Sequence, residues 1–139
     1  MTMPDGAFGE RVRARLRDER VIWLTTVAAD GTPQPNPVWF LWDGADAVLV
    51  YNRPDAVRLG HASARPQVSL HFDGDGRGGD IVVLAGTAAA DPRAVPPHEN
   101  AEYVAKYGEA MIRVSGSHAG FSEQYPVPLR IGIRRIRGH

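Results

Sequence analysis

Two arginines and an asparagine stand close together in the sequence where an apolar run ends. Asn52 and Arg53 close that run, and Arg58 follows five residues later. Guanidinium groups bind phosphate oxygens through paired hydrogen bonds, and a helix that begins at Asp55 would add the partial positive charge of its first amides. These residues predict a phosphate site. The alternative is that either arginine pairs with a surface carboxylate such as Asp55.

Aromatic residues gather in and next to the segment that precedes this group. They are Trp23, Trp39, Phe40 and Trp42. Aromatic side chains on adjacent strands usually fill a core, but they also form a flat slot for a ring system. The residue types leave both interpretations open.

Other motifs do not support chemistry of their own. The glycines of segment 73–80 have the spacing G-x-G-x-x-G, but a strand is expected after them where a dinucleotide site needs a helix. The aspartates of that segment suggest calcium, yet Leu84 stands where an EF-hand loop needs glutamate. We therefore interpret 73–80 as a flexible, solvated hairpin loop.

Hydrolase and metal motifs are missing as well. The chain has no cysteine, its five histidines form no pair one helical turn apart, and no serine lies in a G-x-S-x-G elbow. We expect no metal site, and no catalytic residue can be named from a motif.

The elements that must position these residues follow from hydrophobic periodicity. Phe8, Val12 and Leu16 predict an amphipathic helix over 7–18. Strands are expected at 20–28, 34–42 and 46–52, with tight turns at Asp30-Gly31 and Asp43-Gly44 that make the three a meander. Three prolines, Pro33, Pro35 and Pro37, mark the start of the second strand as irregular or edge-like.

Further elements complete the prediction. A helix is expected over 55–64 with Asp55 as its N-cap, followed by strands at 67–72 and 81–90. Helical segments come next at 97–107 and, more weakly, 109–115. The last strand is 127–137, and its pattern breaks at Arg134-Arg135-Ile136, either at a bulge or at the rim of a barrel. The fold class is mainly β (α+β): a six-stranded antiparallel barrel with flanking helices.

Composition limits the remaining possibilities. A chain of 139 residues fits a single domain over 1–139. Acidic and basic residues balance at 16 each, which predicts no nucleic-acid partner, and no apolar run approaches the roughly 20 residues of a membrane span. The N-terminus lacks the apolar core of a signal peptide, so we expect a cytoplasmic protein without a membrane partner.

The order of these segments resembles the flavin- and deazaflavin-binding proteins of the pyridoxamine 5'-phosphate oxidase-like split-barrel superfamily. The resemblance covers almost the whole chain. It rests on the N-terminal helix and on the segments DGTPQPNPVWFLWDG, VLVYNRPDAVRLGHASARPQVSLHF, GTAAA and RIGIRRIRG. The pattern W-F-x-W-D-G is most similar to the branch that uses coenzyme F420 in place of FMN.

This resemblance implies an FMN-binding-like split barrel that forms a homodimer, with cofactor sites at the subunit interface. It implies that Asn36, Pro37, Val38 and Trp39 line the cofactor ring, and that Tyr51, Asn52, Arg53 and Arg58 hold the ribityl-phosphate portion. The family often has lysine at the position of Arg58 and asparagine at that of His61. Residues 106–125 would be offered by the partner subunit.

The implied activity is that of an oxidoreductase, an F420-dependent reductase that delivers hydride to an unsaturated small-molecule substrate. Tyr51, His61 and solvent are the alternatives for the proton. An FMN-dependent oxidase or reductase is the nearest rival, and a non-catalytic carrier of the cofactor or a heme-binding split barrel is another.

Overall fold

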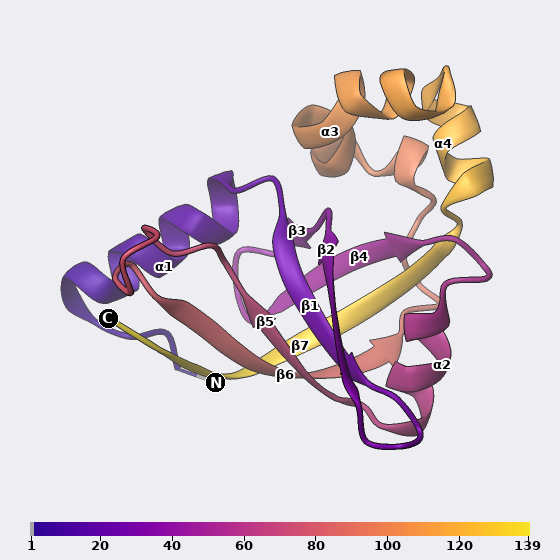
Figure 1. Cartoon of the computed structure of the whole chain (residues 1–139). Coiled ribbons are helices and arrows are strands. Elements are labelled where there is room, and N and C mark those ends of the chain that lie inside the picture. Colours follow the sequence, from indigo (N-terminus) through magenta and orange to yellow (C-terminus); the bar gives the residue numbers. More distant parts are fainter. Residues whose placement is uncertain (1) are drawn as a thin grey trace.

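The structure is a computed structural model that describes residues 2–139 as one curled antiparallel sheet with helices around it (Figure 1). The strands are β1 (Ile22–Val27), β2 (Pro33–Val38), β3 (Leu41–Trp42), β4 (Ala47–Asn52), β5 (Gln67–His71), β6 (Val82–Ala90) and β7 (Val127–Gly138). The helices are α1 (Gly6–Asp18), α2 (Val57–Ala64), the 3₁₀ turn η1 (Pro97–Glu99), α3 (Ala101–Ser115) and α4 (His118–Gln124). None of the helices described is long and apolar enough to cross a membrane.

The sheet has seven strands in the order β2-β1-β5-β6-β7-β4-β3, where six were predicted. The difference arises in the expected strand 34–42, which is divided into β2 and β3. These two strands form opposite edges of the sheet, although only Trp39 and Phe40 separate them in the chain. The sheet must therefore curl until both edges meet at these two residues.

The side chains of α3 explain why the strand breaks at Phe40. The backbone N–H of Phe40 donates to the Tyr107 hydroxyl at 3.0 Å, and its carbonyl accepts from Lys106 Nζ at 3.0 Å. Both backbone groups are thus satisfied by side chains, and no strand pairing is needed there. Both predicted hairpins are present, as the pairs β1–β2 and β3–β4, but the break at Phe40 places them at opposite edges of the sheet, so they do not form one continuous meander.

The two predicted turns are confirmed. Gly31 and Gly44 have φ angles of 88° and 80°, in the region that glycine adopts without strain. The carboxylate of Asp43 also accepts from the amides of Ala45 and Ala47 at 2.8 and 3.1 Å. The prolines of β2 lie at an edge of the sheet, as predicted, since they offer no N–H to a further strand.

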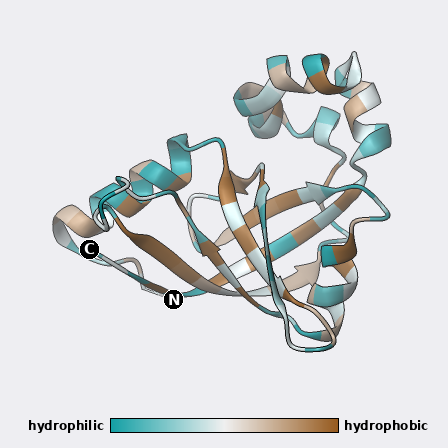
Figure 2. Ribbon diagram, in the orientation of Figure 1, coloured by the Kyte–Doolittle hydropathy of each residue, from teal (hydrophilic) through white to brown (hydrophobic). Residues whose placement is uncertain are grey.

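The buried side of the sheet and α1 form the main hydrophobic core. Figure 2 shows apolar residues concentrated along the strands, while α1 is largely hydrophilic outside its buried stripe. Val12 and Leu16 of α1 are fully buried, and Phe8 packs against the same cluster, so the predicted amphipathic helix is confirmed. Arg15 anchors the exposed loop 73–80 through bonds to the carbonyl of Asp73 at 2.6 Å and the carboxylate of Asp80 at 3.1 Å.

The predicted helices need two corrections. The first is that α2 begins at Val57 with Ala56 as its N-cap, and Asp55 makes no capping bond because its carboxylate turns toward Arg53 at 3.8 Å. The second is that the segments 97–107 and 109–115 become the turn η1 followed by one continuous helix, α3, which Asn100 caps through the amide of Tyr103.

Two further details concern the C-terminal half. The short helix α4, capped by Ser117, was not predicted. In the ladder between β6 and β7, Ala85 pairs with Arg135 and Gly86 with Ile133. Arg134 is left over, so the break in the pattern of the last strand is a β-bulge.

Candidate functional site

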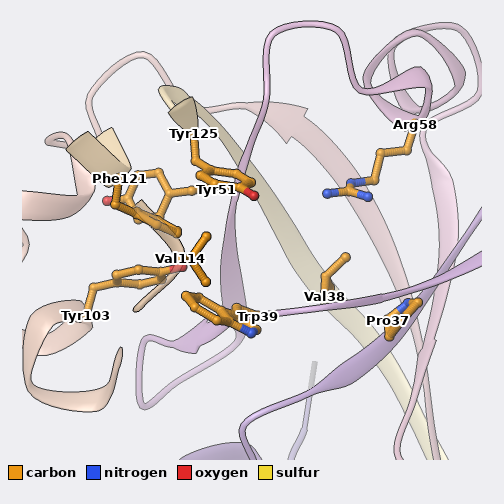
Figure 3. Close-up of a pocket in the computed structure, with 9 residues that line it drawn as sticks. All are labelled: Pro37, Val38, Trp39, Tyr51, Arg58, Tyr103, Val114, Phe121 and Tyr125. Carbon is orange, nitrogen blue, oxygen red and sulfur yellow. The ribbon is translucent and has the colours of Figure 1, made fainter. Parts of the chain in front are cut away.

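A cavity of about 250 Å³ lies where α3 and α4 face the curled sheet (Figure 3). Strands β2 and β4 and helix α2 supply one part of its wall, and α3, α4 and the residue after α4 supply the other. Its lining residues are Pro37, Val38, Trp39, Tyr51, Arg58, Tyr103, Val114, Phe121 and Tyr125. The wall is mostly aromatic and contains one charged side chain.

The aromatic wall is a packed cluster separate from the main core. Trp39, at the break between β2 and β3, stacks on Tyr107 with ring centroids 4.7 Å apart and 3° between the ring planes. It also stacks on Phe121 at 5.5 Å. Tyr103 meets Tyr51 edge-on at 4.8 Å. These contacts hold the aromatic rings in place around the cavity, and an aromatic wall of this kind suits a conjugated ligand.

Arg58 is the charged group of the cavity, and a hydrogen bond to Asn52 fixes its orientation. Its Nε donates to Oδ1 of Asn52 at 2.6 Å. Asn52 is fully buried, and its amide nitrogen donates to the carbonyls of Val50 and Val127 at 3.0 and 3.1 Å. Burial lowers the pKa of Arg58, which still carries its charge at neutral pH.

No carboxylate forms an ion pair with Arg58 within residues 2–139. A half-buried guanidinium without a counter-ion favours an anionic ligand. The cavity therefore combines a surface for a flat ring with one site for a negative group.

The structure brings together five of the eight residues predicted to bind a cofactor. Pro37, Val38, Trp39, Tyr51 and Arg58 line the cavity.

The other three do not line the cavity. Asn52 supports Arg58 from behind, and Asn36 bonds to the backbone of Gln34 at 3.4 Å. The side chain of Arg53 is 56% exposed, pairs with Asp55 and lies over the ring of Tyr125 at 5.6 Å. The alternative of a surface ion pair thus describes Arg53 and does not describe Arg58.

Sequence reasoning missed four lining residues: Tyr103, Val114, Phe121 and Tyr125. Three of them belong to the segment 106–125, which we expected to come from a partner subunit, whereas here they line a cavity of their own chain. A signal was present, because Phe121 and Tyr125 stand four residues apart and so share one helical face, as do Tyr103 and Tyr107.

The hydroxyl of Tyr51 is already occupied. It donates to the carbonyl of Val95 at 2.7 Å and accepts from Asn100 Nδ2 at 3.1 Å. Burial raises the pKa of Tyr51. His61 contacts the hydroxyl of Thr26 at 3.3 Å and does not line the cavity. Neither side chain therefore presents a free proton to a ligand there.

The remaining motifs form no second site. Within residues 2–139, no three His, Cys, Asp or Glu side chains are grouped to hold a metal ion. Ser122 Oγ accepts from the backbone N–H of His98 at 2.9 Å and lies 2.7 Å from its Nδ1. The contact between Ser122 and His98 connects α4 to η1.

Comparison with solved structures finds the same fold in proteins with different ligands. An F420 reductase superposes with a TM-score of 0.68 at 20% identity, covering 96% of this chain and 98% of that one. A FAD-binding protein from Mesorhizobium loti gives 0.65 at 21% identity, with 91% and 88% covered. HutZ, the heme storage protein of Vibrio cholerae, gives 0.67 at 15% identity, with 93% and 92% covered.

At these identities the likeness establishes the fold alone. No protein with a curated description matches the sequence. The sequence profile of the family described as pyridoxamine 5'-phosphate oxidase matches residues 8–132, which is most of the chain. The chain therefore belongs to the pyridoxamine 5'-phosphate oxidase family.

Proposed function

We propose that the protein is an F420-dependent oxidoreductase that reduces an unsaturated small molecule. The observation that carries this proposal is the cavity itself, in which an aromatic wall and one unpaired arginine face the same space. A deazaflavin has the two matching features, a flat conjugated ring and a phosphate. The likeness to an F420 reductase and the W-F-x-W-D-G segment support this cofactor over others of the family.

When bound, the reduced deazaflavin would supply the hydride, so the protein needs little acid-base machinery. Its own residues have other tasks. Arg58 binds the phosphate, Trp39 and Phe121 orient the ring, and Val38 and Val114 exclude water from one side of it. The sequence has no catalytic triad motif, which agrees with a protein that binds and orients a cofactor and leaves the chemistry to it.

FMN is the second candidate, because it has the same combination of a flat ring and one phosphate, and a FAD-binding relative shares the fold. A heme carrier is less well supported. None of the nine lining residues is a histidine, so the cavity offers no imidazole as an axial ligand.

We also propose that the protein acts as a homodimer. A cavity of about 250 Å³ lies just below the range of roughly 300–1,000 Å³ that is usual for ligand pockets. Val114 is 50% exposed at its edge, and Ile112 of the same helix is 49% exposed. A second subunit over this apolar surface would enlarge and close the site. Sedimentation equilibrium would test this, and a monomer at all concentrations would refute it.

Fluorescence titration with F420 and with FMN tests the cofactor proposal. We expect saturable binding of F420 that is tighter than binding of FMN. Tighter FMN binding would replace the first candidate by the second. Failure of both cofactors to bind would overturn the proposed function.

A further inference from the structure

The hydroxyl groups of the tyrosines around the cavity differ in whether they have a partner. Tyr51 bonds to Val95 and Asn100, and the hydroxyl of Tyr107 lies 2.7 Å from the carbonyl of Arg20 and 3.0 Å from the amide of Phe40. Tyr103 is 1% exposed as a residue, but its hydroxyl forms no hydrogen bond within residues 2–139 and is not one of the fully buried polar atoms that lack a partner there, so it opens onto the cavity that Tyr103 lines. Tyr125 also lacks one, but it is only half-buried.

A hydroxyl that opens onto a cavity and has no partner in the protein can form a hydrogen bond with whatever molecule fills that cavity. The ring of Tyr103 is held by three others, since Tyr51, Tyr107 and Phe121 have their centroids 4.8, 4.9 and 6.1 Å away. The hydroxyl is therefore fixed in one place, at the surface of the cavity that the residue lines. A ligand that displaces water from this cavity must provide the hydroxyl with a new partner.

The direction of the bond follows from the charge state of the phenol. Burial raises the pKa of Tyr103 strongly, with smaller contributions from the neighbouring tyrosines. The group stays protonated at any working pH and donates its hydrogen. Its partner must then be an acceptor, and the acceptor of a flat conjugated molecule is typically a carbonyl oxygen.

We propose that the Tyr103 hydroxyl donates a hydrogen bond to a carbonyl oxygen of the conjugated ligand that binds in this cavity. This inference rests on the proposed function and adds a second point of recognition. Figure 3 shows Tyr103 and Arg58 entering the cavity from opposite sides, with Val38 and Trp39 between them. Arg58 fixes the anionic end of the ligand, and Tyr103 fixes an oxygen on the ring.

The carbonyl can belong to the cofactor ring or to the acceptor substrate. Both are conjugated carbonyl compounds, so the experiment must separate them. The test variant is Tyr103→Phe, which keeps the ring in place and removes only the hydroxyl. The matched control is Tyr51→Phe, a neighbouring ring of the same cluster whose hydroxyl is bound within the protein.

Thermal unfolding of the two variants without ligand is the first measurement. We expect Tyr103→Phe to be at least as stable as the wild type, because its hydroxyl has no partner to lose, and Tyr51→Phe to be less stable. A marked loss of stability in Tyr103→Phe would mean that the hydroxyl serves the fold, which overturns the proposal.

Ligand binding is the second measurement. In the cofactor arm, titration with F420 and FMN should give about five- to tenfold weaker binding for Tyr103→Phe than for the wild type. If the carbonyl belongs to the substrate instead, the cofactor affinity of Tyr103→Phe is unchanged, and its KM for an α,β-unsaturated ketone or quinone rises by a similar factor. Either result supports the proposal and identifies the owner of the carbonyl.

Equal cofactor affinity together with equal KM and kcat in Tyr103→Phe and the wild type would overturn the inference while leaving the proposed function intact. A wild type that binds neither cofactor would refute the proposed function, and this inference with it.

Discussion

Nε of Arg58 donates to Oδ1 of Asn52 at 2.6 Å, so a fully buried amide holds the one charged group of the cavity. The other end of that amide is bonded to the backbone of β4 and β7 through Val50 and Val127. The guanidinium is thereby tied to two central strands of the sheet. Arg58 is oriented before any ligand arrives, which reduces the entropy lost on binding.

Replacement of Asn52 should therefore affect both stability and binding. Asn52→Ala removes the side-chain bonds to two backbone carbonyls and to Arg58 Nε, and we expect the free energy of unfolding to fall by about 1–3 kcal/mol. Chemical denaturation measures this, and cofactor titration should show weaker binding as well. Asn36→Ala, at a position with one weak surface bond, is the control and should change stability by less than about 0.5 kcal/mol.

The two arginines should differ in their effect on cofactor binding. Removing the charged partner of a phosphate by Arg58→Ala should weaken affinity about 10- to 100-fold. Arg53→Ala should have little effect, because that side chain is exposed and pairs with Asp55. Calorimetric titration of both variants checks this. Equal losses of cofactor affinity in the two variants would show that Arg53 also binds the ligand.

Tyr107 should stabilise the point where the sheet closes. Tyr107→Phe removes the hydroxyl bonded to the Phe40 amide and the Arg20 carbonyl. We expect the free energy of unfolding to fall by about 1–3 kcal/mol. Tyr125→Phe serves as the control, since no bond to its hydroxyl is lost. Chemical denaturation of both variants measures this. Equal free energies of unfolding for Tyr107→Phe and Tyr125→Phe would mean that the Tyr107 hydroxyl does not stabilise the closure of the sheet.

Lys106 should make stability depend on alkaline pH. Burial, followed by the nearby charge of Arg20, lowers its pKa from 10.5 to about 8. Between these values the unfolded chain holds a proton that the folded protein has released. The free energy of unfolding should therefore rise with pH in this window.

Denaturation at pH 8, 9 and 10, compared with Lys106→Met, isolates this contribution. The range ends at pH 10 because burial raises the pKa of Tyr107 to about 12, and that group lowers stability as the pH increases beyond 10. Wild type and Lys106→Met with parallel pH profiles would contradict the prediction.

Gly86 should tolerate no side chain. A Cβ at this position would lie 2.7 Å from Ile131 Cγ2 and 3.0 Å from the carbonyl of Gly132, so Gly86→Ala should destabilise the fold by about 1–3 kcal/mol. Gly132→Ala is the control, because its nearest contact is 3.9 Å away. Thermal unfolding compares the stability of the two variants. Similar losses of stability in Gly86→Ala and Gly132→Ala would show that the close contacts of the added Cβ are not the cause.

Features decided by neighbouring residues could be predicted from the sequence. The tight turns followed from Asp-Gly pairs, the edge position of β2 from its prolines, and the bulge at Arg134 from a lost alternation. Features decided by distant residues could not. The break at Phe40 depends on Lys106 and Tyr107, more than 60 residues away in the chain.

The candidate site divides in the same way. The segment 36–58 contributed five of the residues that line the cavity, because strand and helix were recognised there. Which way Asn52 and Arg53 face depends on their contacts with Arg58 and Asp55, and the sequence alone does not determine it. The aromatic residues of α3 and α4 were overlooked because they meet the cavity only after the chain has folded back over the sheet.

That fold-back has a consequence for the order in which the protein acquires its structure. Tyr107 bonds to Phe40 where the two sheet edges meet and also stacks on Trp39. The sheet cannot close fully, and Trp39 cannot take its place, until α3 has been synthesised and has docked. Late, long-range contacts of this kind make folding slow. Trp39 fluorescence would therefore report the closure of the sheet, and the cavity that Trp39 lines is complete only when that closure has taken place.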